Sequence, residues 1–162
     1  MSACSEAIHI LDFYWDKELP VNLEAIATQL GVTVEKCLKI DDDWDISGKF
    51  TYVNGNPVCF VNTADIETRQ RFTLAHELGH FVLRHGEHID RTDSLYRNNN
   101  EYQDWREVEA NIFAAELTMP RSALDFLIMK KNITRIDDLA REFGMSERAM
   151  YYRLKNTGWL ND

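Results

Sequence analysis

Positive charge is scarce in this sequence. Its 162 residues include 18 Lys and Arg against 27 Asp and Glu, which gives a formal net charge of −9. Proteins that bind nucleic acid draw much of their affinity from Lys and Arg side chains that contact phosphates. A primary role in DNA or RNA binding is therefore not expected, and we predict no direct nucleic-acid partner.

Cysteine is also rare. Cys4, Cys37 and Cys59 lie far apart, their number is odd, and no CxxC pair is present. This spacing is not typical of a disulfide framework or of a cysteine-based zinc site. Reduced thiols fit a cytosolic protein best, so we predict a cytoplasmic location.

Long apolar runs are missing as well. The first twenty residues carry four acidic side chains and no apolar core of the kind that a secretory signal has. No stretch predicts a membrane span, so no membrane partner is expected. With 44% hydrophobic and 28% charged residues, the composition is ordinary for a globular protein of one domain or two small lobes.

The patterns that are present are mostly helical. Asn22 can cap a helix that Gly31 ends, and residues 32–38 fit either a short strand or a further helical turn. The expected helices span residues 6–16, 22–30, 65–85, 105–117, 121–131 and 136–154, the last divided into two near Gly144.

One hairpin interrupts the helices. Asn54-Gly55 separates the β-rich runs 50–53 and 58–61, and Asn-Gly between such runs is a strong hairpin signal. The sequence therefore predicts an α+β fold that is mostly helical, with a small antiparallel sheet.

The clearest chemical signal is His76-Glu77-Leu78-Gly79-His80, an HExxH pattern on a predicted amphipathic helix. Residues four apart on a helix lie one above the other, so the imidazoles of His76 and His80 can bind one ion. Zinc accepts neutral imidazole nitrogen. Glu77 lies beside that face, where its carboxylate can take a proton from water. The pattern predicts a Zn²⁺ site with Glu77 as the catalytic base.

A catalytic zinc needs three protein ligands and one open position. His85 is rotated off the face of His76 and His80, and His88 falls in the polar segment 86–103. Both are expected to be exposed to solvent. The third ligand is therefore expected to be a carboxylate from a second helix.

The helix at 105–117 offers Glu107 and Glu109, whose side chains point about 200° apart, so both cannot bind one metal. Small residues and Asn111 share the face of Glu107, which favours Glu107 as the ligand and Asn111 as a side chain that orients a ligand. The alternative is that Glu107 is a first-turn glutamate in a capping arrangement with Asp104. Glu109 and Glu116 are expected to be solvated surface charges.

Together these residues resemble the ImmA/IrrE family of metallopeptidases over nearly the whole chain. The resemblance is carried by PVNLEAIA at 20–27, RFTLAHELGH at 71–80 and EVEANIFAAELTMP at 107–120. It implies a gluzincin-like, zincin-type core, two His and one Glu on zinc, and Glu77 as the base. By position, the family's ligand glutamate falls on Glu107. Thr118 stands where Leu is more usual, which leaves the site unaffected.

The C-terminal segment resembles a helix-turn-helix. We expect residues 1–120 to form the metallopeptidase domain and residues 121–162 a helical lobe packed on it. Between residues 135 and 155 the five basic side chains (Arg135, Arg141, Arg148, Arg153, Lys155) exceed the four acidic ones (Asp137, Asp138, Glu142, Glu147) by only one. A packing lobe that can also hold a protein partner is favoured over a DNA reader.

The expected activity is zinc-dependent peptide hydrolysis. The family's usual targets are helix-turn-helix repressors, so the resemblance implies a repressor or antitoxin as substrate. The alternative is a non-catalytic toxin or regulatory partner with a structural zinc. The strand at 58–61 is a candidate edge for an extended substrate, and segment 86–103 a candidate gate. The oxyanion donor stays open among Tyr96, Tyr102, Tyr151 and Tyr152.

Overall fold

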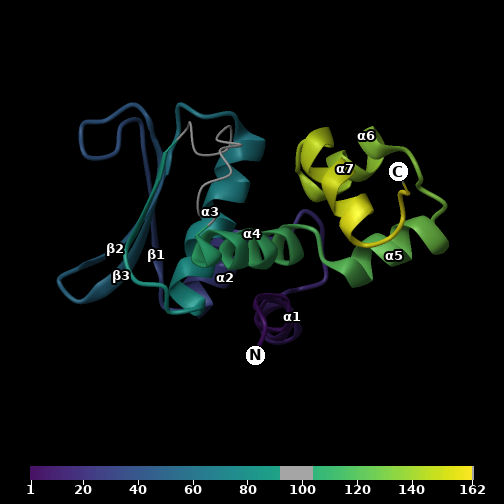
Figure 1. Ribbon diagram of the computed structural model, residues 1–162, viewed down its shortest axis with the longest axis horizontal. Coiled ribbons are helices and arrows are strands. Elements are labelled where there is room, and N and C mark those ends of the chain that lie inside the picture. Colours follow the sequence, from purple (N-terminus) through teal and green to yellow (C-terminus); the bar gives the residue numbers. More distant parts are fainter. Residues whose placement is uncertain (92–103, 162) are drawn as a thin grey trace.

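The computed structural model describes residues 1–91 and 104–161 (Figure 1). Within them the chain is an α+β protein with seven helices and one four-stranded sheet. In chain order the elements are α1 (Ala3–Tyr14), α2 (Leu23–Gln29), β1 (Thr33–Cys37), β2 (Ile46–Val53), β3 (Asn56–Asn62), α3 (Glu67–Val82), β4 (His88–Arg91), α4 (Trp105–Thr118), α5 (Arg121–Met129), α6 (Ile136–Phe143) and α7 (Glu147–Asn156).

The sheet has the strand order β1-β3-β2-β4 and is mixed, so the prediction of a purely antiparallel sheet was wrong. β2 and β3 form the predicted hairpin, and Asn54 and Gly55 both have the positive φ that a tight turn requires. Residues 33–37, left open by the sequence, are strand β1. β1 pairs with β3 and runs parallel to it, and this pair makes the sheet mixed.

Strand β3 is interior, so the expectation that residues 58–61 form a free sheet edge was also wrong. The edge beside the HExxH helix is β4, whose four residues pair with β2. A hairpin motif identifies two neighbouring strands, but it says nothing about which further strands join on either side. The choice of edge depends on residues far away in the sequence.

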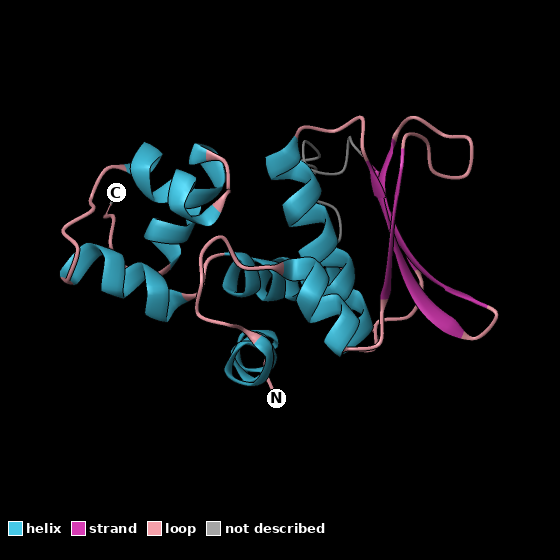
Figure 2. Cartoon of the chain, turned by 180° about the vertical axis from the view of Figure 1, so that it is seen from behind, coloured by secondary structure: helices cyan, strands magenta, loops and turns pink. Residues whose placement is uncertain are grey.

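The helices lie on one side of the sheet (Figures 1 and 2). α3 packs on β2 and β3, α4 packs on α3, and α1 packs against α4. Ile26, Phe50, Leu78, Phe113 and Leu117 are buried in the core between these elements. Burial of each such side chain contributes about 1.5–3 kcal/mol to stability, which fixes α3 between the sheet and α4.

Two glycines allow close packing around α3. A Cβ on Gly79 would lie 3.1 Å from the Phe113 ring and 3.3 Å from Cα of Ala110, so α3 and α4 approach closely there. A Cβ on Gly48 in β2 would overlap the methyl group of Thr73 and lie 3.3 Å from Cγ of Glu77. Small residues therefore bring the sheet and α4 against the HExxH segment from two sides.

Helices α5, α6 and α7 surround a second apolar cluster that includes Leu124, Leu139, Phe143 and Met150. Ser146 caps α7 by accepting a hydrogen bond from the backbone N–H of Ala149, as its position predicts. These helices lie beside the end of α4 that is remote from the sheet (Figure 2).

A buried ion pair joins α4 to α7. Arg153 donates to the carboxylate of Glu116 and, through Nε, to the carbonyl oxygen of Met119 at 3.0 Å. The Glu116 side chain is 6% exposed, so the expectation of a surface charge was wrong. Its cationic partner lies 37 residues away, and one helical pattern alone cannot reveal such a partner.

A search of the helices in the described residues found none with the length and apolar character that crossing a membrane requires.

Candidate metal centre

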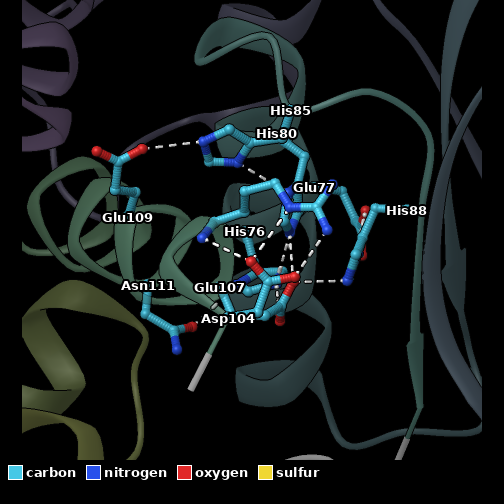
Figure 3. A network of polar contacts seen from close by, with 10 residues as sticks. His76, Glu77, His80, His85, His88, Asp104, Glu107, Glu109 and Asn111 are labelled. Atoms are coloured by element: carbon cyan, nitrogen blue, oxygen red, sulfur yellow. Dashed lines mark hydrogen bonds and ion pairs between the residues drawn. The ribbon is translucent and has the colours of Figure 1, made fainter. Parts of the chain in front are cut away.

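His76 and His80 lie one turn apart on α3 and are almost fully buried, with 4% and 1% of their surface exposed. Their Nε2 atoms lie 3.1 Å apart and point to the same position (Figure 3). The spacing i, i+4 on a helix produces this geometry.

Glu107 reaches the same position from the first turn of α4. Its Oε2 lies 3.3 Å from Nε2 of His76, and its Oε1 lies 3.0 Å from Nε2 of His80. Asp104 caps α4 through the backbone N–H of Arg106, and the carboxylate of Glu107 is directed at the two histidines. The structure thus brings together the two imidazoles and the carboxylate that the sequence selected as ligands.

Each imidazole is oriented through its other ring nitrogen. Nδ1 of His76 lies 2.9 Å from Oδ1 of Asn111, and Nδ1 of His80 lies 3.1 Å from Nδ1 of His85. An N–H on Nδ1 of His76 donates to the Asn111 oxygen, which leaves Nε2 free to bind an ion. Asn111 has the position that was predicted for a side chain orienting a ligand.

Glu77 lies beside this cluster and has no exposed surface. Its two carboxylate oxygens lie 3.0 and 3.2 Å from Nδ1 of His88. Burial raises the pKa of Glu77, while hydrogen bonding to His88 opposes the shift. A carboxyl group with a raised pKa is a stronger proton acceptor than an ordinary one.

His88 is at the site, and the expectation that it would be exposed was wrong. It belongs to β4, its side chain is 19% exposed, and its Nε2 lies 2.8 Å from Oε1 of Glu107. The alternation on β4 is inverted: the polar His88 and Asp90 are more buried than Ile89 between them. A search for strands by hydrophobicity misses such a segment, because Ile89 is its only apolar residue.

His85 and Glu109 form a pair at the border of the site. The His85 side chain is 2% exposed, which contradicts the predicted exposure, and its Nε2 lies 3.0 Å from Oε2 of Glu109. Glu109 does not reach the position between His76 and His80, as its angle on the helix predicted. Its side chain is 41% exposed but has this partner.

Burial and hydrogen bonds with Glu107 shift the histidines of the cluster in opposite directions: the pKa of His76 is raised and that of His80 is lowered. Burial lowers the pKa of His80 to about 4, so its imidazole is neutral. Burial opposes ionisation of Glu107, but its hydrogen bonds with His76, His80 and His88 outweigh this and hold its pKa far below the usual range. Burial also opposes the charge on His88, yet its hydrogen bonds with Glu107 and Glu77 raise its pKa to about 10.

These residues fit a divalent metal ion. His76, His80, His88 and Glu107 each offer one ligand atom, and the four atoms lie within 4.8 Å of one another. Neutral imidazole and ionised carboxylate are the forms that bind metal, and this set of nitrogen and oxygen donors is common at zinc. His88 is the one member that the sequence did not select.

Four tyrosines were considered as oxyanion donors. Tyr96 and Tyr102 lie outside the described residues, as does most of segment 86–103. Tyr151 and Tyr152 are exposed on α7, where their rings pack edge to face.

Comparison with known proteins agrees with the geometry. The Peptidase_M78 family model, described as the IrrE N-terminal-like domain, matches residues 27–155. The chain is also 33% identical over 104 residues to the radiation response metalloprotease IrrE of Deinococcus deserti. That match covers 60% of this chain and 35% of the relative, so the chain spans well under half of that protein. The HExxH helix, the carboxylate of α4 and the matched family model together confirm the predicted resemblance: the chain belongs to the ImmA/IrrE family, Peptidase_M78.

Proposed function

We propose that this protein is a zinc-dependent endopeptidase whose metal is bound by His76, His80 and Glu107. The observation that carries the proposal is the convergence of two buried imidazoles and one carboxylate, with Glu77 buried beside them. Zinc, when bound, supplies Lewis acidity that makes water more acidic and a carbonyl more electrophilic.

The protein side chains supply the proton transfers. Glu77 takes the proton of the attacking water and passes it to the leaving amine. His88 holds the Glu77 carboxylate through Nδ1. Asn111 keeps the His76 ring in the orientation that directs Nε2 to the metal.

A second function rests on His88. If His88 completed a four-ligand zinc site, the metal would be structural, and the protein would be a non-catalytic toxin or regulatory partner. The variant His88→Asn separates the two functions. An enzyme keeps zinc in this variant and loses turnover, whereas a closed structural site loses zinc affinity as severely as it does in His76→Ala. We favour the enzyme because the family model that matches the chain is that of a peptidase.

We propose that the substrate is an extended peptide segment that pairs with β4. This strand is at the edge of the sheet and carries His88, so a peptide added there would pass the metal site. We therefore propose β4, and not residues 58–61, as the edge strand that binds an extended substrate.

The partner that we propose is a cytoplasmic helix-turn-helix repressor or antitoxin. The net charge of −9 would attract a basic DNA-binding protein. We further propose that residues 121–162 form a separate helix-turn-helix-like lobe that helps to hold this partner; the second apolar cluster supports that division.

Incubation of the zinc-loaded protein with the repressor encoded by the neighbouring gene tests this proposal, with casein as a control and Glu77→Gln as the matched inactive variant. Fragments mapped by mass spectrometry should show cleavage of the repressor at one or a few positions by the native protein only. Rapid digestion of casein would indicate a general peptidase. A stable complex with an intact repressor would favour the non-catalytic function.

A further inference from the structure

A chain of hydrogen-bonding groups runs from the buried site to the surface. Nδ1 of His80 lies 3.1 Å from Nδ1 of His85, and Nε2 of His85 lies 3.0 Å from Oε2 of Glu109 (Figure 3). His80 is in the last turn of α3, His85 lies just beyond the end of that helix, and Glu109 comes from α4. The sequence predicted His85 and Glu109 to be exposed to solvent, with no role at the metal site.

If both rings are neutral and Nε2 of His80 binds an ion, only one assignment of the ring protons satisfies the two contacts. The proton of His80 must then be on Nδ1, from which it donates to Nδ1 of His85. The accepting ring carries its own proton on Nε2, which donates to the carboxylate of Glu109. Each ring thus has one donor and one acceptor nitrogen in use.

The fold holds His85 in this position. The backbone N–H of His85 donates to the carbonyl oxygen of His80 at 2.9 Å, and Arg84 between them has a positive φ of 60°. This turn folds His85 back toward α3. The indole of Trp105 packs edge to face on the His85 ring, with the ring centres 5.3 Å apart. The His85 side chain is 2% exposed, so water has little access to its two contacts.

We propose that Glu109 and His85 are positioning residues that orient His80 as a metal ligand. The relay of Glu109, His85 and His80 is anchored by a carboxylate, and such anchoring fixes the ring and makes its ligating nitrogen more basic. Two residues of α4 then act at the metal site: Glu107 binds the metal directly, and Glu109 orients His80 through His85. The inference rests on the proposed function, because it requires that His80 binds the metal.

The first test measures zinc affinity by competition with a chelator. Glu109→Ala and His85→Ala should each weaken zinc binding about 10- to 100-fold. His85→Gln, whose side-chain oxygen can accept a hydrogen bond from His80, should recover part of the loss. Glu142→Ala removes an exposed carboxylate from α6 and is the charge-matched control, which should bind zinc as the native protein does. The double variant should be no weaker than His85→Ala, because the two residues act in series.

The second test reads the proton positions by long-range proton–nitrogen NMR of the histidine rings in the zinc-loaded protein. The native protein should show His80 protonated at Nδ1 and His85 at Nε2. Glu109→Ala changes a partly exposed side chain, so the fold should be retained, and His85 should lose its single tautomer.

Native affinity and an unchanged His85 tautomer in Glu109→Ala would overturn the relay while leaving the proposed function intact. A native protein that binds no zinc would instead overturn the proposed function, and with it the relay.

Discussion

The Nε2 atoms of His76 and His80 lie 3.1 Å apart on one face of α3, with the Glu107 carboxylate against both. We therefore expect about one zinc per chain. Alanine at any of the three positions should lower occupancy, and Glu107→Ala should lower it more than Glu109→Ala does. Metal analysis of the purified variants measures this, with the exposed His9→Ala as the control. Retention of zinc by Glu107→Ala would remove Glu107 from the ligand set.

Removal of the metal should destabilise the fold. A ligand that binds only the folded state adds about 2.7 kcal/mol at one hundred times its Kd. We therefore expect a chelator to lower the melting temperature of the native protein, and added zinc to restore it. The melting temperature of His76→Ala should respond to neither treatment. A melting temperature that zinc leaves unchanged in the native protein would contradict a metal held at this position.

Glu77→Gln should separate the base from the ligands. The amide keeps the shape of the side chain but accepts no proton, so hydrolysis should fall at least about 100-fold. Zinc content and melting temperature should stay near native values, because Glu77 faces His88 and not the position between His76 and His80. If this variant lost its zinc, Glu77 would be a ligand.

Gly48 is required by the contact between β2 and α3. A Cβ there would overlap the methyl group of Thr73, and overpacking of this kind costs about 1–3 kcal/mol. Gly48→Ala should lower the free energy of unfolding in urea by this amount. Thr73→Ser removes the methyl group, so the double variant Gly48→Ala/Thr73→Ser should recover much of the loss. Equal stability of Gly48→Ala and the native protein would mean that the strand moves away at little cost.

The ion pair between Glu116 and Arg153 should be costly to break from one side. With side chains only 6% and 9% exposed, removal of either partner leaves a buried charge, at a cost of about 3–5 kcal/mol. Arg153→Met should show this loss in denaturant unfolding, whereas the exposed Arg148→Ala should be nearly neutral. Replacing both partners with Leu and Met should restore most of the stability. An additive loss in the double variant would show that packing and not charge is responsible.

Cys59 should be chemically silent in the folded protein. Its side chain is buried in the core, and burial raises the pKa of its thiol far above the usual value of about 8.5. The thiol therefore stays protonated as the pH rises from 7 to 9, while an ordinary cysteine becomes a reactive thiolate. Alkylation followed by peptide mapping should label Cys59 only after unfolding. Labelling at pH 8 in the native state would show local opening of β3.

Local patterns predicted most of the elements. The helical period placed α3 and α4, Asn54-Gly55 placed the hairpin, and Ser146 marked the start of α7. The HExxH spacing and the angle between Glu107 and Glu109 also predicted which side chains meet. In each case the pattern itself lies within a few neighbouring residues, so it can be recognised in a single sequence.

The predictions that were wrong are of two kinds. Some residues have partners that are distant in sequence, and others lie where a helical period does not describe the chain. His88 was assigned to solvent because β4 is short and buries its polar residues, which the sheet and α3 together allow. His85 leaves the helical phase at Arg84, so its direction could not be read from α3. Glu116 pairs with Arg153 of α7, and β1 pairs with β3 in the sheet. Both contacts are consequences of tertiary packing.

The packing of α1 against α4 has a consequence for biosynthesis. The ribosome makes the HExxH helix before the helix that carries Glu107, and α1, which precedes both, packs against that later helix. A nascent chain that ends before Trp105 thus lacks both the surface on which α1 packs and the carboxylate that faces His76 and His80. The cluster of His76, His80 and Glu107 is therefore completed only after α4 has been synthesised.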